Sequence, residues 1–411
     1  MAHNRPTVAL VGTLDTKGAE YQWMADRLLE LGTDVIVIDA GIRPPHGFAG
    51  AVEFDNRVVA AEGGASLDAL ADGNDRGVAV TTMGEGAAAI TAQLLAAERL
   101  DGVLALGGSG GSSIAARAVR ELPVGLPKLL VSTMASGDVA PYVGATDVTL
   151  MYSVVDIAGI NRISRSVLGN AAAAIAGMAR AHHERPHTEE GDRPLVGASM
   201  FGVTTPAVDA ARERLDELGY EVLVFHATGS GGRALEALTR SGMLAGVLDL
   251  TTTELADELV GGVLSAGPDR LTAAAASGVP QVVSLGALDM VNFGARDTVP
   301  DQFADRDFFV HNATVTLMRT TADENAELGR IVGGKLAGAA KTVLIVPRGG
   351  VSALDAEGMP FFDAVADAAL FDAVIAAATG IHIIESEANI NDPALARRAA
   401  DELHALIGAT P

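Results

Sequence analysis

Asp101–Arg117, with the sequence DGVLALGGSGGSSIAAR, decides the fold that we expect for this chain. Val103–Leu106 is a short apolar run, which predicts a buried strand. The loop Gly107–Gly111 contains only glycine and serine, and an alanine-rich helix is expected to start at Ser112, because serine is a good N-cap. A strand, a glycine loop and a helix in this order predict one βα unit of an α/β fold.

The glycine loop of this unit predicts an anion site. Glycines let the backbone approach a ligand closely, and the free N–H groups and the dipole of the helix favour negative charge. A tight turn that binds nothing is the alternative, but such a turn needs only one or two glycines. The loop is not a P-loop, since no Gly-Lys-Ser/Thr ends it, and it fits GxGxxG poorly. The motif therefore predicts a phosphate-like anion and leaves the ligand open.

Composition predicts helices packed on parallel sheets in two domains. The chain has 411 residues, which is long for one domain, and 49% of them are hydrophobic but only 4% aromatic. Such a composition, with 47 glycines, suits alanine- and valine-rich α/β domains with glycine turns. The net charge of −23 argues against binding of nucleic acid or anionic membranes, so a phosphate site must act locally through N–H groups and a few cations.

Cysteine content and hydropathy predict where the protein works. The sequence has no cysteine, which excludes disulfide and thiolate chemistry. The first residues, MAHNRPTVALVG, lack a signal-peptide pattern, and no apolar run approaches the roughly 18 residues of a membrane helix. We therefore expect a soluble, cytoplasmic protein.

The beginning of the chain predicts a βαβ unit with two reactive side chains in its turn. We expect a strand, a polar turn, a helix and a second strand at Thr7–Gly12, Thr13–Gly18, Glu20–Leu31 and Val35–Ile38. The two strands are expected to be parallel, and ligands of such sheets lie at the carboxyl ends of the strands. Lys17 is therefore predicted to contact a phosphate held by the glycine loop, and Asp15 to bind a metal ion or a ribose hydroxyl. A solvated surface lysine is the alternative for Lys17.

Further loops rich in threonine, serine and glycine are predicted at the same edge. Gly77–Thr82 is predicted as a strand followed by the loop Met83–Gly86, and Lys128–Ser132 as another strand followed by Thr133–Asp138. In the first of these loops Glu85 is an acid, a magnesium ligand or simply a first-turn helix residue. Convergence of these loops on one edge predicts a binding site more strongly than any single loop.

A polar segment divides the chain. A strand at Val148–Met151 and a long helix at Asn161–Ala181 are expected before His182–Pro194, which has the sequence HHERPHTEEGDRP and no apolar period. We predict domains at residues 1–184 and 195–411, joined by a linker at 185–194. A metal site built from the histidines of this segment is not expected, because the segment offers too little rigidity.

The second half of the chain repeats the first. The recurring pattern is a strand, a threonine-bearing turn, a helix, Leu-Gly and a strand. The matched pairs are Val196–Gly229 with Val8–Gly41, Ala245–Leu250 with Asp101–Leu106, Val279–Ser284 with Leu126–Val131, and Val315–Met318 with Val148–Met151. We therefore predict an α/β protein of two Rossmann-like, doubly wound parallel-sheet domains related by internal duplication.

The second domain carries its own candidate residues at the carboxyl ends of its strands. Phe225–Arg233 is a second glycine loop, which is either a second anion site or a bare turn. Pro347–Asp363 is a long loop of the kind used as a lid, and Asp392 with Pro393 predicts the start of the last helix. The candidate catalytic residues are His226, Glu254, Asp257, Asp289, His311 and Arg319, as acid/base groups, metal ligands or, for the arginine, an anchor of an anionic substrate. Each of them alone has a structural role as its alternative.

Nine ordered motifs resemble the tobamovirus-resistance-protein-like ATP-binding family. These motifs are GTLDTKG (Gly12–Gly18), TTMGEG (Thr81–Gly86), GGSGGSS (Gly107–Ser113), STMASGD (Ser132–Asp138), FHATGSGG (Phe225–Gly232), DLTTTELADEL (Asp249–Leu259), ALDMVNFG (Ala287–Gly294), HNATVTLMRTT (His311–Thr321) and NDP (Asn391–Pro393). The resemblance covers nearly the whole chain and implies two Rossmann-like domains, a homodimer and ATP in the first domain. The family includes a plant inhibitor of viral replication, which continues into a barrel-like C-terminal region that has no counterpart here, and its antiviral role is not expected of this chain.

The resemblance assigns the nucleotide site to loops of the first domain, with Mg²⁺ as a candidate companion of ATP at Asp15 or Glu85. The implied nucleotide-binding residues are Asp15, Thr16, Lys17, Thr82, Gly84, Glu85, Gly107, Gly108, Ser109, Gly110, Gly111 and Ser112.

Three functions are compatible with these features. The first is an ATP-binding enzyme of small-molecule metabolism whose second domain acts on a small anionic or carbonyl metabolite. The second is a nucleotide-regulated dimeric binding module without chemistry. The third is an oxidoreductase that uses a nicotinamide dinucleotide, which the poor match to GxGxxG disfavours.

Overall fold

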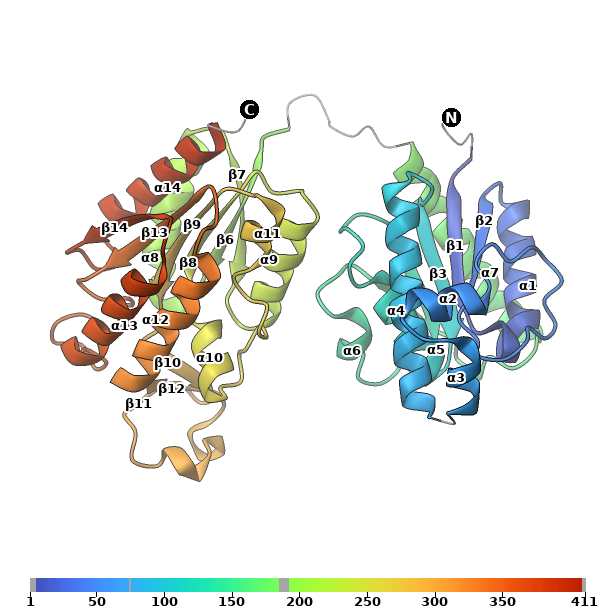
Figure 1. Cartoon of the computed structure of the whole chain (residues 1–411), viewed down its shortest axis with the longest axis horizontal. Coiled ribbons are helices and arrows are strands. Elements are labelled where there is room, and N and C mark those ends of the chain that lie inside the picture. Colours follow the sequence, from blue (N-terminus) through green and yellow to red (C-terminus); the bar gives the residue numbers. More distant parts are fainter. Residues whose placement is uncertain (1–4, 74, 185–191, 409–411) are drawn as a thin grey trace. The chain divides into compact units, whose positions relative to one another are not determined.

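The computed structural model describes residues 5–73, 75–184 and 192–408 of the chain. The chain divides into two compact units, Met1–Glu189 and Glu190–Pro411, and each contains its own parallel sheet (Figure 1). Residues 185–191 of the predicted linker lie outside the described residues. Within the described ranges, no helix is both long and apolar enough to span a membrane.

The first unit alternates strands and helices. Its elements are β1 (Thr7–Gly12), α1 (Leu14–Glu30), β2 (Asp34–Asp39), α2 (Asn56–Glu62), α3 (Leu67–Asp72), α4 (Arg76–Ala96), β3 (Gly102–Gly107), α5 (Ser109–Val119), β4 (Lys128–Ser132), α6 (Ala140–Val143), β5 (Thr149–Tyr152) and α7 (Arg162–His183).

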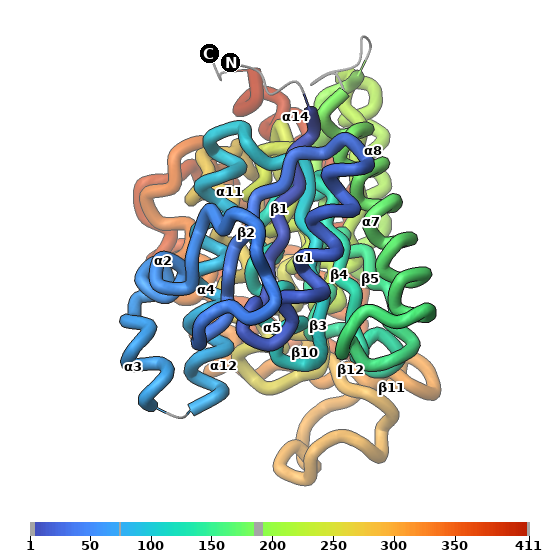
Figure 2. The backbone as a smooth tube through the Cα atoms, turned by 90° about the vertical axis from the view of Figure 1, so that its right-hand side faces the viewer, coloured from blue at the N-terminus to red at the C-terminus, as the bar shows by residue number. Residues whose placement is uncertain are grey.

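The sheet of the first unit is covered by helices on both faces. Its strands are all parallel and lie in the order β2-β1-β3-β4-β5. Residues of α2, α4 and α5 form a hydrophobic core against one face, and residues of α1 and α7 form a second core against the other. Figure 2 shows α1 and α7 side by side along that second face. This confirms a doubly wound α/β fold.

The strand order changes direction between the paired strands β1 and β3, and the Tyr21 hydroxyl bridges their carboxyl ends. The Tyr21 hydroxyl donates to the carbonyl oxygens of Val11 (2.6 Å) and Leu106 (2.9 Å) and accepts from the Leu106 N–H. A Cβ atom at Gly12 would lie 1.9 Å from the tyrosine ring, so glycine is required there. Ligands of open α/β sheets bind at the carboxyl ends of the strands at this kind of switch point.

Two local predictions in the first unit are wrong. Gly77–Thr82, predicted as a strand, belongs to the long helix α4, which Asp75 caps by accepting from the N–H groups of Gly77 and Val78. Thr13–Gly18, predicted as a polar turn, is the start of α1, with a non-helical residue at Lys17. The described residues of this unit therefore form five strands rather than the predicted six.

The second unit has the same alternation with an antiparallel insertion. Its elements are β6 (Leu195–Met200), η1 (Gly202–Thr204), α8 (Thr205–Glu217), β7 (Glu221–His226), α9 (Ser230–Arg240), β8 (Gly246–Thr251), α10 (Glu254–Val260), α11 (Ala273–Ser277), β9 (Gln281–Gly286), β10 (Met290–Phe293), η2 (Arg296–Thr298), η3 (Asp301–Phe303), β11 (Phe308–Asn312), β12 (Val315–Arg319), α12 (Ala322–Leu336), β13 (Thr342–Pro347), α13 (Ala364–Ala377), β14 (His382–Ser386) and α14 (Pro393–Gly408).

Strand order supports the internal duplication and corrects one of its matches. The second parallel sheet has the order β7-β6-β8-β9-β13-β14, so β7 to β13 repeat the order of the first sheet. The register agrees too, because Met200 pairs with His226 as Gly12 pairs with Asp39. However, β12, which was matched to β5, lies in the antiparallel sheet β10-β12-β11. The strand beside β9, and thus the counterpart of β5, is β13.

Candidate functional site

A cavity of about 520 Å³ lies at the carboxyl ends of β1 and β3, at the switch point of the first sheet. It is lined by residues from the start of α1, the segment after β2, the first turns of α4 and the glycine loop before α5. The predicted nucleotide residues that line it are Asp15, Thr16, Lys17, Gly108, Ser109, Gly110 and Gly111. The structure thus brings together two loops that lie about 90 residues apart in the sequence, as the parallel topology predicts.

The floor of this cavity is the amino end of α5. Gly108 is the N-cap residue and Ser109 the first helical residue. The Ser112 N–H donates to the Gly108 carbonyl, so the amides of the preceding turn are the ones that lack an acceptor within the helix. Free amides and the helix dipole make this end attractive to an anion.

The glycines of this loop are not explained by the fold itself. An added Cβ atom would find its nearest neighbour at 3.6 Å for Gly108 and Gly111, an ordinary contact. For Gly110 the nearest atom, at 3.2 Å, is the flexible end of the Arg76 side chain. None of the three has a backbone conformation reserved for glycine. What these glycines leave free is the space above the helix end, where a ligand would approach.

Three cationic side chains line the same cavity. Lys17, Arg43 and Arg76 come from the start of α1, the segment after β2 and the first turn of α4. The Lys17 ammonium group donates to the Ile157 carbonyl at 2.5 Å, and no ion pair with Arg43 or Arg76 is found among the described residues. Sequence reasoning missed both arginines. Arg76 was missed because the strand predicted at Gly77–Thr82 placed it at the opposite edge of the sheet, and Arg43 because it lies in a loop without a motif.

The same region contains two carboxylates, those of Asp15 and Asp39. Asp15 Oδ2 accepts from the N–H groups of Ile42 and Arg43, both at 3.1 Å, whereas its Oδ1 is buried without a hydrogen-bond partner. Asp39, the last residue of β2, accepts through Oδ1 from the N–H groups of Leu14 (3.1 Å) and Gly41 (2.9 Å). Burial, with a smaller contribution from nearby Asp15, raises the pKa of Asp39 to about 6.

The TTMGEG motif does not form the predicted loop of the site. Thr82, Gly84 and Glu85 lie within α4, and the glycine at position 84 allows close packing on Arg117 of α5. Glu85 is exposed and pairs with Arg117 at 2.7 Å, which lowers the pKa of Glu85. Instead, the helix turns Ala79, Val80 and Met83 toward the cavity.

Gly107 and Ser112, also predicted at the nucleotide site, are packing residues beneath it. A Cβ atom at Gly107 would lie 3.1 Å from the Gly111 Cα atom. The Ser112 hydroxyl is buried and shares a 2.7 Å hydrogen bond with the Ser132 hydroxyl. Neither residue lines the cavity.

The second glycine loop already holds an anion, the carboxylate of Glu254. Glu254 Oε1 accepts from the N–H groups of Gly229 (2.6 Å) and Gly232 (3.0 Å). Its Oε2 accepts from Arg270 Nε at 2.7 Å, and both side chains are completely buried. A Cβ atom at Gly232 would lie 2.0 Å from the Glu254 carboxylate. The predicted external anion site at Phe225–Arg233 is therefore filled from within.

Three other predicted catalytic residues are also buried in internal contacts. Asp257 Oδ1 accepts from the Asn292 N–H at 2.9 Å, and Oδ2 from the Asn292 side-chain amide at 2.6 Å. Asp289 accepts from the Ser352 hydroxyl at 2.7 Å, and Arg319 pairs with Asp367 at 2.5 Å. Burial raises the pKa values of Asp257 and Asp289 to about 7.

The two predicted histidines are exposed on separate strands. His226 ends β7, where its ring stands edge-on to Phe201, and His311 lies on β11. In the described part of the chain, no hydrogen bond or ion pair joins any two of His226, Glu254, Asp289 and His311. The structure therefore shows no direct contact among these four residues, and a pocket that they share stays a prediction. The described ranges also contain no group of three or more histidine, aspartate or glutamate side chains able to hold a metal ion.

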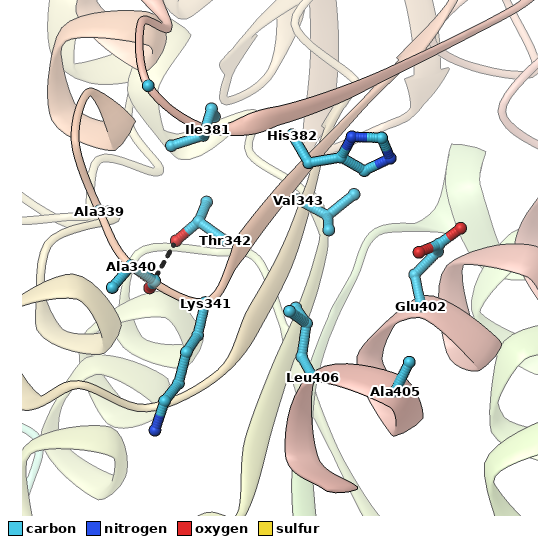
Figure 3. Close-up of a pocket in the computed structure, with 11 residues that line it drawn as sticks. Ala339, Ala340, Lys341, Thr342, Val343, Ile381, His382, Glu402, Ala405 and Leu406 are labelled. Carbon is cyan, nitrogen blue, oxygen red and sulfur yellow. Dashed lines mark hydrogen bonds between the residues drawn. The ribbon is translucent and has the colours of Figure 1, made fainter. Parts of the chain in front are cut away.

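A cavity of about 380 Å³ in the second unit lies at the opposite end of its sheet, where β13 and β14 begin (Figure 3). Lys341, His382 and Glu402 are its charged or titratable lining residues, and Figure 3 shows the lysine extending away from the other two. Because none of these three side chains is buried, the cavity lacks the fixed polar groups of a built site.

Comparison with known proteins identifies the family. Residues 6–184 match the N-terminal domain of the Uncharacterised protein family (UPF0261), and residues 193–407 match its C-terminal domain. A UPF0261 protein of Clostridium tetani is 50% identical over 405 residues, which cover 96% of this chain and 98% of that protein. The ToMV resistance protein Tm-1(GCR237) of Solanum lycopersicum is 41% identical over 388 residues, which cover 89% of this chain and 51% of that protein.

Similarity to solved structures is weaker. A UDP-N-acetylglucosamine 2-epimerase from Rickettsia bellii is 11% identical, with a TM-score of 0.22, over 68% of this chain and 79% of that structure. A score this low supports no argument about fold or function. The family matches confirm the predicted kinship with tobamovirus-resistance proteins, and the chain belongs to the Uncharacterised protein family (UPF0261).

Proposed function

We propose that the chain is an ATP-binding protein whose nucleotide site is the switch-point cavity of the first unit. The observation that carries this proposal is that neither backbone conformation nor backbone packing requires glycine at positions 108, 110 and 111, where an added Cβ atom would meet ordinary contacts or the flexible end of Arg76. Glycine at all three positions is accounted for by a ligand that approaches the backbone. The second glycine loop, which follows β7 rather than the counterpart of β3, provides the contrast, because there the carboxylate of Glu254 accepts from the loop's own N–H groups.

The charged groups that line the cavity favour a polyphosphate as the part of the ligand next to the first glycine loop. The protein carries a net charge of −23, so its long-range field repels nucleotides. The cavity offsets this locally with Lys17, Arg43 and Arg76 and with the amino end of α5. Mg²⁺ is usually held by one or two carboxylates together with phosphate oxygens, and the unpartnered Oδ1 of Asp15 fits that role.

Burial in the second unit favours a nucleotide-regulated binding module over an enzyme. Glu254, Asp257, Asp289 and Arg319 are each at most 6% exposed and are engaged in internal contacts. Such residues stabilise a fold but cannot reach a substrate without opening it. The homodimer implied by the family resemblance remains part of this proposal, with ATP setting the geometry of the assembly or of a partner.

An enzyme acting on a small metabolite is the second candidate, favoured by the carboxyl groups whose pKa values burial raises to about 7. Groups of this kind suit acid–base catalysis at neutral pH. Incubation of the full chain with Mg²⁺, ATP and candidate metabolites distinguishes the two. Intact ATP after long incubation supports the module, and turnover that Asp289→Asn abolishes supports the enzyme.

The test of the nucleotide site is the substitution Gly110→Val, with ATP affinity measured by calorimetry on the full chain. A valine side chain there covers the amino end of α5, so we expect ATP affinity to fall at least about tenfold. Gly177→Val is the matched control, because Gly177 lies on the exposed face of α7 with no atom within 4 Å of an added Cβ. Unchanged ATP affinity in Gly110→Val, with the fold retained by circular dichroism, contradicts the proposal.

A further inference from the structure

A second cavity, of about 600 Å³, adjoins the switch-point cavity on the side of β2. The two share Ile42 and Arg43 in their linings. Its remaining walls come from the end of β2, the loop after it, and α2 and α3. The two cavities are therefore neighbours, with Ile42 and Arg43 between them.

One carboxylate oxygen in this cavity lacks a partner. Asp39 lines the cavity and is 1% exposed, and its Oδ2 is buried without a hydrogen bond. Its Oδ1 accepts both of the backbone N–H groups that the fold supplies, those of Leu14 and Gly41. A buried acceptor without a donor costs about 1–3 kcal/mol, so the fold alone gives no reason for a second carboxylate oxygen here.

The two cavities differ in charge. The switch-point cavity contains Lys17, Arg43 and Arg76 against the single carboxylate of Asp15. The second cavity is lined by four carboxylates, and of its two arginines Arg57 already pairs with one of them. The carboxylates are Asp39, Asp55, Asp68 and Asp72. Phosphates are therefore favoured in the first cavity and repelled from the second, which suits neutral hydroxyl and amino groups.

We propose that the second cavity holds the nucleoside half of a ribonucleotide, with the Asp39 Oδ2 atom accepting a hydrogen bond from a ribose hydroxyl. This inference rests on the proposed nucleotide function and names the ligand class of that site. Asp39 is the last residue of β2, so it lies at the carboxyl end of a strand, where ligands of parallel α/β sheets bind. Asp39 is thus assigned as the residue that distinguishes ribose from other substituents of a phosphate.

The test uses the full-length protein with Mg²⁺ and three ligands, ATP, 2′,3′-dideoxy-ATP and tripolyphosphate, titrated by calorimetry. We expect the wild-type protein to bind ATP about tenfold more tightly than dideoxy-ATP, because the sugar hydroxyls are the donors that Asp39 lacks. Asp39→Asn keeps an oxygen for Leu14 and Gly41 but replaces the second oxygen with an amide. It should therefore bind ATP and dideoxy-ATP equally, with its tripolyphosphate affinity unchanged.

Asp26→Asn is the control, since it removes the same charge from an exposed position of α1 that lines neither cavity. It should keep the preference for ATP. Equal wild-type affinities for ATP and dideoxy-ATP, with tripolyphosphate still bound, would overturn this inference and leave the glycine-loop site standing. Failure of both ATP and tripolyphosphate to bind would instead overturn the proposed function itself. The comparison of ATP and dideoxy-ATP affinities in the wild-type protein tests the inference even if Asp39→Asn does not fold.

Discussion

At the scale of residues, the two glycine loops of the chain differ in what lies against their backbone N–H groups. Each places backbone N–H groups at the start of a helix, where negative charge is stabilised. In the second unit Glu254 supplies that charge from within and Arg270 neutralises it. In the first unit no carboxylate of the described residues lies over Gly110, where an added Cβ atom would meet only the side chains of Arg76 (3.2 Å) and Val80 (3.7 Å). A loop of this kind remains available to a ligand.

The cations around the open loop can be tested one at a time. Lys17→Ala and Arg76→Ala are each expected to weaken ATP binding at least about tenfold, because each removes a positive charge beside the phosphates. Calorimetric titration of the full chain measures the effect. Arg27→Ala is the control, since Arg27 is exposed on α1 and pairs with Glu30. If either test variant binds ATP as the wild type does, that residue is not part of the site.

The buried carboxylates of the second unit predict a pH dependence of stability. Asp289, Asp355 and Asp367 surround Arg319, and burial raises the pKa values of Asp289 and Asp367 to about 7. Between the ordinary aspartate pKa, near 4, and pH 7 the folded state therefore holds protons that the unfolded state releases. The free energy of unfolding must fall as pH rises through that window.

Asp289→Asn tests this dependence because it removes one ionisation from the group. Urea unfolding followed by far-UV circular dichroism at pH 5 and pH 8 should show a smaller loss of stability in the variant, by roughly 1–3 kcal/mol. The exposed residue Asp297 provides the control substitution Asp297→Asn. An identical loss between the two pH values in wild type and Asp289→Asn would mean that Asp289 is ionised throughout.

At the scale of elements, α4 is where the sequence was most misleading. Val78, Val80 and Thr82 are β-branched, which favours a strand locally. The correct signal was the spacing of the buried residues Ala79, Met83, Ala87, Ile90 and Leu94, which recurs every three to four positions as in a helix. Tertiary packing decided the outcome, because α4 covers one face of the sheet and brings Arg76 to the cavity.

The helical reading of TTMGEG makes a prediction about its last glycine. A Cβ atom at Gly86 would lie 1.8 Å from the Val59 carbonyl oxygen of α2, so Gly86→Ala should destabilise the first unit by about 2–4 kcal/mol. Trp23, the single tryptophan of the chain, lies in α1 and reports on this unit during urea unfolding. Gly177→Ala, on the exposed face of α7, should stabilise slightly. No destabilisation by Gly86→Ala would contradict the packing of α4 on α2.

Other elements were predictable because their signals are local. The strand, glycine loop and helix around Gly107–Gly111 fold as expected, although the helix begins at Ser109 rather than Ser112. Asp392 caps α14 through the N–H groups of Ala394 and Leu395, as its position before Pro393 predicts. In contrast, nothing local reveals that Glu254 fills a loop more than 20 residues earlier in the chain. The role proposed for Asp39 likewise depends on a cavity that only the folded structure defines.

At the scale of the whole molecule, two copies of one α/β plan have diverged in what occupies the ends of their strands. Both sheets share the strand order from β2 to β5 and from β7 to β13. At the carboxyl ends of β1 and β3 the first unit has a cavity of about 520 Å³. At the corresponding ends of β6 and β8 the second unit has buried threonines, including a 2.7 Å hydrogen bond between the Thr204 and Thr251 hydroxyls. This difference supports a first unit that binds a ligand and a second unit whose strand ends are filled by its own side chains.

The most direct test of this account is hydrogen–deuterium exchange of the full chain with and without Mg²⁺ and ATP. ATP bound at the proposed site must slow exchange of the amides at Ser109–Gly111 and of those in the first turn of α1. It should leave the amides of Gly229 and Gly232 unchanged, because Glu254 already binds them. Protection confined to the second unit, or no protection of the first glycine loop at saturating ATP, would contradict the account.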